Sequence, residues 1–215
     1  MEIEMPVLQT YTSPLRGIWK ITETFPELPN LFSSDKKESR AYIINMKSEA
    51  RKTEYLAVRL LLNHLLEKNV EILHHTDGSP YLIDNEYYIS ISHTKGYAAI
   101  ILSKAAYPGI DIEYRSERAF LLKERFLGEE ELNLISREKT ISPADMATLF
   151  WCAKETAFKS LKYRDVDFVK HLHVLSCLMD ENAGTLVMEE TKTEKKQSFA
   201  IDFEITDDYI ITWKG

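Results

Sequence analysis

The chain has 215 residues, 44% hydrophobic and 28% charged, which is enough to bury a core and excludes a largely disordered or linker-dominated protein. Its 27 basic and 34 acidic residues give a net charge of −7, which argues against a general nucleic-acid-binding protein. Two cysteines, and no apolar run long enough to span a membrane, indicate a cytoplasmic protein without disulfides or a membrane anchor.

The first half of the chain predicts one long helix among short strands. A strand is expected at residues 16–22. Ser48 is a candidate N-cap for a helix that runs to about Lys68, with leucines at near-helical spacing. Apolar segments from Val70 onward predict a run of strands through Ser103, interrupted by a turn at residues 76–80.

The second half repeats the order of helix and then strands, after a strand at residues 109–114. Residues 118–137 predict a helix with a break at Gly128, and residues 142–163 predict a long helix that opens at Ser142-Pro143. Antiparallel strands are expected over the remainder. The sequence therefore predicts the α+β class, with one half at 1–107 and the other at 108–215.

Two acidic residues on the strand at 109–114 are candidates for a metal site. Asp111 and Glu113 are two positions apart, so they point to the same side of a strand. Adjacent carboxylates repel each other unless a cation or water lies between them, and oxygen ligands suit Mg²⁺ or Mn²⁺. A solvated strand face is the competing interpretation, and for such a pair alone it is the commoner one.

The long helix of the second half carries another candidate pair. Glu155 and Lys159 are four residues apart, which makes them neighbours on a helix surface. Trp151 and Phe158 are expected to anchor the helix in the core while Glu155 and Lys159 face a pocket. A surface ion pair is the competing interpretation.

Residues of the first half are candidates for phosphate binding. Ser92 and His93 fall at the predicted end of a strand, where hydroxyl, imidazole and backbone N–H groups can hold phosphate oxygens. Arg51 lies in the first turn of the helix that follows Ser48, and arginine can bind phosphate through two parallel hydrogen bonds. A histidine in a turn and a solvated helix face are the competing interpretations.

The order and spacing of these candidates resemble the 4′-phosphopantetheinyl transferase superfamily, in its longer, single-chain Sfp-type branch. The strand Gly109-Ile-Asp111-Ile-Glu113 is similar to the family's G-[IV]-D-x-E motif. The helix Trp151-x-x-Lys154-Glu155-x-x-x-Lys159 is similar to W-x-x-K-E-[AS]-x-x-K, except for Thr156 where the family has Ala or Ser.

Three shorter elements extend the resemblance toward the N-terminus, so that it covers residues 51–159. Ser92-His93-Thr94 is similar to the family's S-H-[ST] element, and Gly78-Ser-Pro80 is similar to its G-x-P turn. Residues 51–59 are similar to its basic helix.

The resemblance implies a fold of two pseudo-equivalent α+β halves with the active site between them. It also implies transfer of the phosphopantetheine arm of coenzyme A to a serine of an apo acyl or peptidyl carrier protein, with release of 3′,5′-ADP. Asp111, Glu113 and Glu155 are then the expected ligands of Mg²⁺, or of Mn²⁺ in its place. Glu155 is the expected general base, directly or through a water, and Lys159 the expected partner of the departing ADP phosphate.

The resemblance implies further contacts to coenzyme A and to the carrier. The expected coenzyme A contacts are Arg51, Ser92, His93, Lys154 and Lys159. The carrier is expected to dock near Arg115, Arg118, Lys123 and Phe126, because carrier domains are acidic around their serine. The enzyme is expected to be a monomer.

Two other functions remain open from the sequence. A metal-dependent phosphohydrolase would use the same carboxylates to hydrolyse coenzyme A or a nucleotide without any carrier. A carrier-docking module without catalysis would bind the carrier and leave its mass unchanged.

Overall fold

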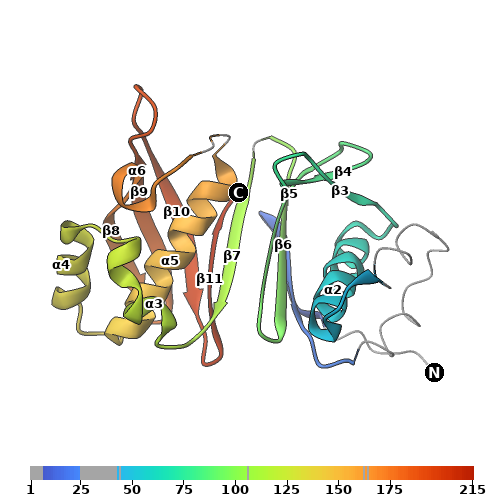
Figure 1. The fold of residues 1–215 in the computed structure, drawn as a ribbon, viewed down its shortest axis with the longest axis horizontal. Helices are drawn as coiled ribbons and strands as arrows, with labels where there is room; N and C mark the ends of the chain where they lie inside the picture. The colour runs from blue at the N-terminus through green and yellow to red at the C-terminus, as the bar shows by residue number, and fades with distance from the viewer. Residues whose placement is uncertain (1–6, 25–42, 44, 106, 162, 164) are drawn as a thin grey trace. The chain divides into compact units, whose positions relative to one another are not determined.

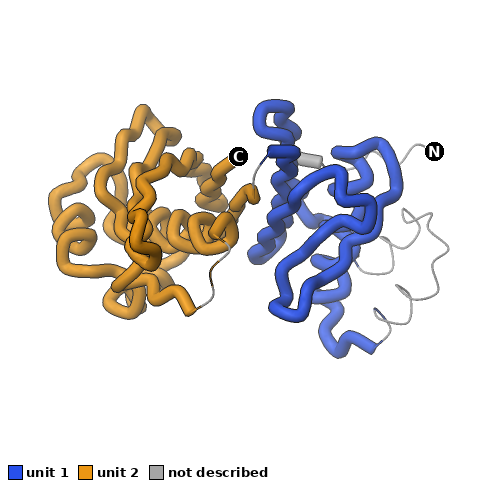
Figure 2. The backbone as a smooth tube through the Cα atoms, turned by 90° about the horizontal axis from the view of Figure 1, so that it is seen from above, with its two compact units in different colours: residues 1–106 blue, residues 107–215 orange. Residues whose placement is uncertain are grey.

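The structure, a computed structural model, describes residues 7–24, 43, 45–105, 107–161, 163 and 165–215. The predicted α+β class is confirmed, since helices pack against antiparallel sheets (Figure 1). The chain divides into two compact units, residues 1–106 and 107–215 (Figure 2), and each unit has a hydrophobic core of its own. Within the described ranges, no helix has both the length and the hydropathy to cross a membrane.

In the described part of unit 1, a long helix packs on an antiparallel sheet with the strand order β1-β2-β6-β5. These strands are β1 (Val7–Thr12), β2 (Leu15–Lys20), β5 (Tyr88–Thr94) and β6 (Tyr97–Ser103). The helix α2 (Glu49–Leu66) packs on β2 and β6. A separate hairpin pairs β3 (Ile72–His74) with β4 (Pro80–Leu82).

The start of α2 follows from the sequence. The hydroxyl of Ser48 accepts the backbone N–H of Arg51 at 3.4 Å, which satisfies one of the free donors of the first turn. Leu56, Leu61 and other apolar residues of the helix are buried in the core beside Trp19. Strand β1 was not predicted, because its sequence VLQTYT lacks a clear apolar alternation and it pairs only with β2, at the edge of the sheet.

Unit 2 is built on a five-stranded antiparallel sheet with the order β7-β11-β10-β9-β8. The strands are β7 (Gly109–Tyr114), β8 (Leu172–Asp180), β9 (Ala183–Glu190), β10 (Gln197–Ile205) and β11 (Tyr209–Lys214). Its helices are α3 (Arg118–Leu121), the 3-10 helix η2 (Lys123–Arg125), α4 (Glu129–Arg137), α5 (Pro143–Ser160) and α6 (Phe168–His171). The longest of them, α5, lies across β7 and β11 (Figure 1).

A glycine allows β7 to lie directly against α5. A Cβ atom placed on Gly109 would be only 2.1 Å from the carbonyl oxygen of Thr156, so the strand backbone touches the helix backbone there. Thr156 is buried, and its hydroxyl lies 2.6 Å from the hydroxyl of Thr212 on β11. The threonine that departs from the family pattern is therefore hydrogen-bonded within the core.

Three segments of unit 2 differ from the sequence-based prediction. The helix predicted between residue 118 and the break at Gly128 is divided into α3 and η2, and the predicted break at Gly128 is present. Residues 169–171 were expected to be part of a strand but form α6 together with Phe168, because the carboxylate of Asp167 accepts the backbone N–H groups of Val169 and Lys170, both at 3.0 Å. The long helix ends at Ser160, before the predicted end.

Replacing Gly109 with alanine should destabilise unit 2, because no side chain fits between β7 and the Thr156 carbonyl. We expect a loss of about 1–3 kcal/mol in the free energy of unfolding, the usual range for an overpacked site, measured by urea denaturation. At Gly128 an added Cβ meets only the Glu131 carboxylate, at 3.8 Å, so Gly128→Ala should cost less. A Gly109→Ala variant as stable as the wild type would contradict the direct contact.

Candidate active site

The predicted carboxylates and lysine of the second half come together in unit 2. Strand β7 carries Asp111 and Glu113, and the adjacent helix α5 carries Glu155 and Lys159. The ammonium group of Lys159 lies 2.7 Å from Asp111 Oδ1 and donates a second hydrogen bond to the carbonyl of Ile110 at 3.0 Å. We call Asp111, Glu113, Glu155 and Lys159 the acidic cluster.

The acidic cluster shifts the protonation of one of its members. Burial raises the pKa of Glu155, the neighbouring Asp111 raises it further, Lys159 lowers it and Glu113 raises it again. The net result is a pKa of about 7. Two carboxylates from β7 therefore act electrostatically on the carboxylate from α5, although Glu155 is more than 40 residues from either of them in the sequence.

A tryptophan on α5 holds Glu113. The indole N–H of Trp151 donates to Glu113 Oε1 at 3.3 Å. The indole ring packs against Phe126, with ring centroids 5.0 Å apart, and against Phe168, at 5.7 Å. Trp151 thus lies between these two aromatic rings and the carboxylate of Glu113. Phe158 was also expected to anchor the helix in the core, but its side chain is 38% exposed.

The chemistry of the acidic cluster suits a hard divalent cation. When all three carboxylates are ionised, they and the one ammonium group leave two negative charges, which one divalent ion would balance, and carboxylate oxygens are the donors that Mg²⁺ prefers. Among the residues that the structure describes, no three histidine, cysteine or acidic side chains are arranged as a preformed metal site. Instead, Lys159 supplies the cation beside Asp111.

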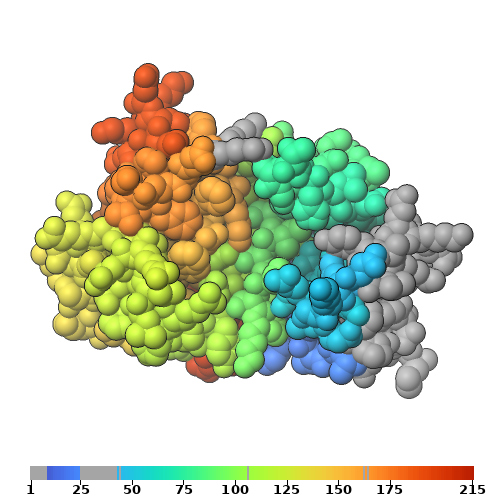
Figure 3. Space-filling model, in the orientation of Figure 1, coloured from blue at the N-terminus to red at the C-terminus, as the bar shows by residue number. Residues whose placement is uncertain are grey.

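A largely apolar pocket of about 650 Å³ opens beside the acidic cluster, within unit 2. Glu113, Trp151 and Glu155 form one side of it. The other sides come from the segment around α3 and from α6, which meet on the surface shown in Figure 3. They contribute Tyr114, Ser116, Arg118, Ala119, Leu122, Arg125, Phe126, Asp167, Phe168, Val169 and Lys170, and Thr148 of α5 completes the lining. Its size and its mixture of apolar walls with a few charged groups are typical of ligand-binding pockets.

Two of the four residues predicted for carrier docking line this pocket, namely Arg118 and Phe126. Arg115 instead forms two hydrogen bonds to the carboxylate of Asp145, at 2.8 and 2.7 Å. The ammonium group of Lys123 lies over the ring of Phe120, 4.2 Å from its centroid.

The sequence reasoning missed the α6 wall of the pocket. Val169 and Lys170 were placed in a strand and Phe168 was left unassigned, so none of the three was grouped with the site. Asp167 could have indicated the start of α6, because an aspartate directly before an apolar segment is typical of a helix N-cap.

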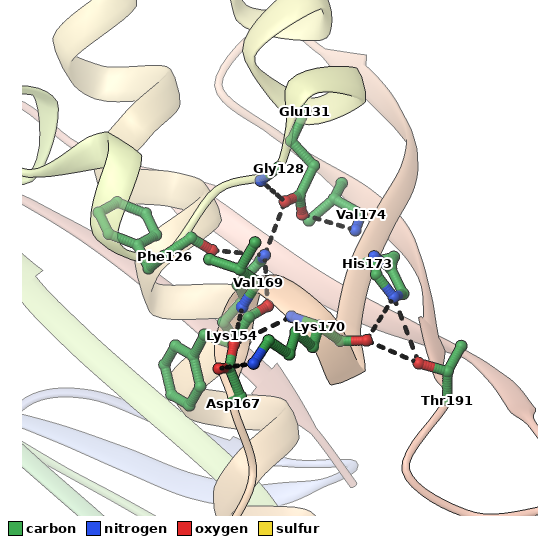
Figure 4. Close-up of polar contacts among 11 residues, drawn as sticks. Phe126, Gly128, Glu131, Lys154, Asp167, Val169, Lys170, His173, Val174 and Thr191 are labelled. Carbon is green, nitrogen blue, oxygen red and sulfur yellow. Dashed lines mark hydrogen bonds and ion pairs between the residues drawn. The ribbon is translucent and has the colours of Figure 1, made fainter.

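Lys154 has a different environment from the acidic cluster. Its side chain is fully buried, and its ammonium group donates to Glu131 Oε2 and to the carbonyl of Phe126, both at 2.7 Å, and to the carbonyl of Phe168 at 2.9 Å (Figure 4). Burial lowers the pKa of Lys154, and Glu131 raises it. All three ammonium hydrogens are used within the protein, so these contacts are structural, and Lys154 does not line the pocket.

The phosphate-binding candidates of the first half lie in unit 1. Arg51 is exposed in the first turn of α2. His93 is also exposed, and its Nδ1 lies 3.4 Å from the carboxylate of Glu54 on the same helix. Ser92 is buried, because successive residues of β5 point to opposite faces of the sheet.

Comparison with known proteins identifies the family. Residues 107–213 match the family model described as "4'-phosphopantetheinyl transferase superfamily". A protein of Haemophilus influenzae named "Putative 4'-phosphopantetheinyl transferase" is 29% identical over 150 residues, which cover 64% of this chain and 59% of the relative. The chain thus spans less than two thirds of that relative's length. The match to residues 107–213 contains both β7 and α5, and on this ground unit 2 of the chain belongs to the 4′-phosphopantetheinyl transferase superfamily.

Proposed function

We propose that the chain is a 4′-phosphopantetheinyl transferase that moves the phosphopantetheine arm of coenzyme A to a serine of an apo acyl or peptidyl carrier protein and releases 3′,5′-ADP. The observation that carries this proposal is the acidic cluster at the edge of an apolar pocket in the unit that matches the family. A charged centre beside an apolar surface suits a reaction in which a pyrophosphate meets a protein substrate.

In this reaction Glu155 takes a proton and Lys159 assists the leaving group. The serine hydroxyl loses its proton to Glu155, directly or through a water. The serine oxygen forms a bond to the phosphorus that bears the pantetheine arm, and the bond from that phosphorus to the bridging oxygen breaks. The ADP phosphate departs with its charge stabilised by the ammonium group of Lys159.

We assign Asp111, Glu113 and Glu155 as the residues that would hold Mg²⁺, with Mn²⁺ as an alternative. When bound, the ion would neutralise the charge of the pyrophosphate. Trp151 fixes the orientation of one of these carboxylates by its hydrogen bond to Glu113. Lys159 balances part of the negative charge on Asp111.

The carrier protein is proposed to dock on the pocket through its charge and its apolar surface. Arg118, Arg125 and Lys170 place positive charges around apolar walls, and they would attract an acidic carrier. From unit 1 we propose Arg51, Ser92 and His93 as coenzyme A contacts, on the resemblance to the family motifs. We propose that the enzyme acts as a monomer in the cytoplasm, where its two free cysteines suit a reducing environment.

Asp111→Asn and Glu155→Gln should each abolish transfer, because each removes a negative charge from the cluster while keeping the size of the side chain. The measurement is mass spectrometry of an apo carrier incubated with coenzyme A and Mg²⁺. Glu130→Gln, which changes an exposed carboxylate on α4, should retain full transfer. Full modification of the carrier by either cluster variant would contradict the assignment.

The same measurement separates the competing functions. A phosphohydrolase would consume coenzyme A without changing the mass of the carrier. A docking module would bind the carrier and leave both molecules unchanged.

The raised pKa of Glu155 predicts a pH-dependent stability of the metal-free protein. The folded chain holds this proton up to about pH 7, whereas the unfolded chain releases it near the ordinary glutamate pKa of 4.5. The stabilisation of the folded state by this bound proton is therefore complete below pH 4.5, and it is lost as the pH rises through 7. Glu155→Gln should stabilise the metal-free protein at pH 8, by roughly 3 kcal/mol at most, and should have little effect near pH 4.5.

Thermal unfolding in the presence of a chelator tests this dependence at the two pH values. Addition of Mg²⁺ at pH 8 should then stabilise the wild type more than Glu155→Gln, since the ion binds only the folded state. An equal effect of the substitution at both pH values would show that Glu155 is not buried among like charges.

Lys159→Met should tighten the binding of a divalent cation, because an ammonium group at 2.7 Å from Asp111 opposes a second cation there. We expect the dissociation constant for Mn²⁺ to fall by about tenfold or more, the equivalent of 1.4 kcal/mol, in titrations followed by electron paramagnetic resonance. Transfer should slow in the same variant. Lys170→Met, at the pocket but not paired with Asp111, is the control, and an unchanged Mn²⁺ affinity of Lys159→Met would contradict the prediction.

A further inference from the structure

A buried ion pair lies behind the two aromatic walls of the pocket. Lys154 is 0% exposed and Glu131 is 2% exposed, and their charged atoms are 2.7 Å apart. Burying two charges is costly unless all their hydrogen-bonding groups are satisfied. The contacts around this pair show what it stabilises (Figure 4).

The lysine connects the two walls. Its ammonium group donates to the carbonyl of Phe126, which follows η2, and to the carbonyl of Phe168, which begins α6. These two residues are 42 positions apart in the sequence, and both line the pocket. One side chain therefore fixes the backbone on both sides of the apolar space.

The glutamate anchors the lysine to the rest of unit 2. Glu131 Oε2 accepts the backbone N–H of Gly128 at 2.8 Å in addition to its bond with Lys154. Its other oxygen, Oε1, accepts the backbone N–H of Val174 on β8 at 2.9 Å. The carboxylate thus joins the start of α4, a strand of the sheet and the ammonium group.

The walls in turn hold the tryptophan of the acidic cluster. The rings of Phe126 and Phe168 both pack on Trp151, which donates its N–H to Glu113. A movement of either phenylalanine would change the surroundings of Trp151 and the shape of the pocket.

We propose that Lys154 and Glu131 are positioning residues, which set the spacing of the two pocket walls for the incoming carrier and do not touch either substrate. The specificity part of this inference rests on the proposed transferase function, whereas the positioning part concerns the protein alone. Both parts share one origin, since a single buried ammonium group holds the Phe126 and Phe168 carbonyls at once.

The first test is Lys154→Met, which keeps most of the length of the unbranched side chain and removes the three hydrogen bonds. Amide hydrogen exchange should accelerate selectively in the segments around residues 123–128 and 166–171. Ile201→Ala, a substitution of a fully buried core residue on β10 that does not line the pocket, is the control for a general loss of stability. If Lys154→Met accelerates exchange evenly over unit 2, as the control should, the positioning role is refuted.

The second test separates positioning from stability. In Lys154→Met the Glu131 carboxylate is left buried without its counter-charge, and the added substitution Glu131→Gln removes that charge. We expect the double variant Lys154→Met/Glu131→Gln to recover much of the lost melting temperature. Its KM for the apo carrier should stay raised, by about tenfold, since a small misplacement of binding groups can cost that much. A KM that recovers together with the melting temperature would overturn the proposal.

The two tests also distinguish the failure of this inference from a failure of the proposed function. If the wild type modifies no carrier, the transferase proposal fails, and hydrogen exchange in Lys154→Met still decides whether the ion pair holds the pocket walls. If the wild type is active and KM for the carrier is unchanged in both variants, the specificity part of the inference fails, and the transferase proposal stands.

Discussion

The site depends on a direct contact between the backbones of a strand and a helix. At Gly109 the strand β7 approaches the carbonyl of Thr156 so closely that a single methyl group would not fit. This contact brings the carboxylates of β7 to the helix face that carries Glu155 and Lys159. The glycine of the G-I-D-I-E segment is therefore needed for the packing of β7 on α5. This packing holds the like charges of the three carboxylates close together in a partly buried site.

Holding like charges together has a free-energy cost, and the structure shows two ways in which it is offset. Lys159 pairs with Asp111, and the raised pKa of Glu155 allows that group to remain protonated near neutral pH. The Lys159–Asp111 ion pair and the raised pKa of Glu155 are both compatible with a site that binds a divalent cation during the reaction. The second ion pair of α5, between Lys154 and Glu131, is buried and hydrogen-bonded, so its role is to stabilise the structure around the pocket. Lys154 and Glu155 are neighbours on α5, but one belongs to the structural ion pair and the other to the acidic cluster. They face different directions because a helix turns about 100° per residue.

The sequence was informative where local patterns determine the structure. The Ser48 and Ser142 caps, the alternation in β7 and the motif spacing predicted α2, α5 and the residues of the acidic cluster. The α6 turn was missed because one aspartate cap overrode an apolar segment that reads as a strand. The structural role of Lys154 could not be read from spacing, since it depends on carbonyl groups at Phe126 and Phe168, and any residue type supplies a carbonyl. The hydrogen bond from Trp151 to Glu113 depends in the same way on tertiary packing.

The most direct measurement is to locate Mn²⁺ by its anomalous scattering in crystals of the protein. If the account is right, one ion lies among the carboxylates of Asp111, Glu113 and Glu155, and the signal disappears in Asp111→Asn. The contradicting result is equally definite. An ion bound instead in the other acidic cavity of unit 2, beside Asp180, Glu181 and Asp207, with none at β7 and α5, would show that the three carboxylates do not share a cation.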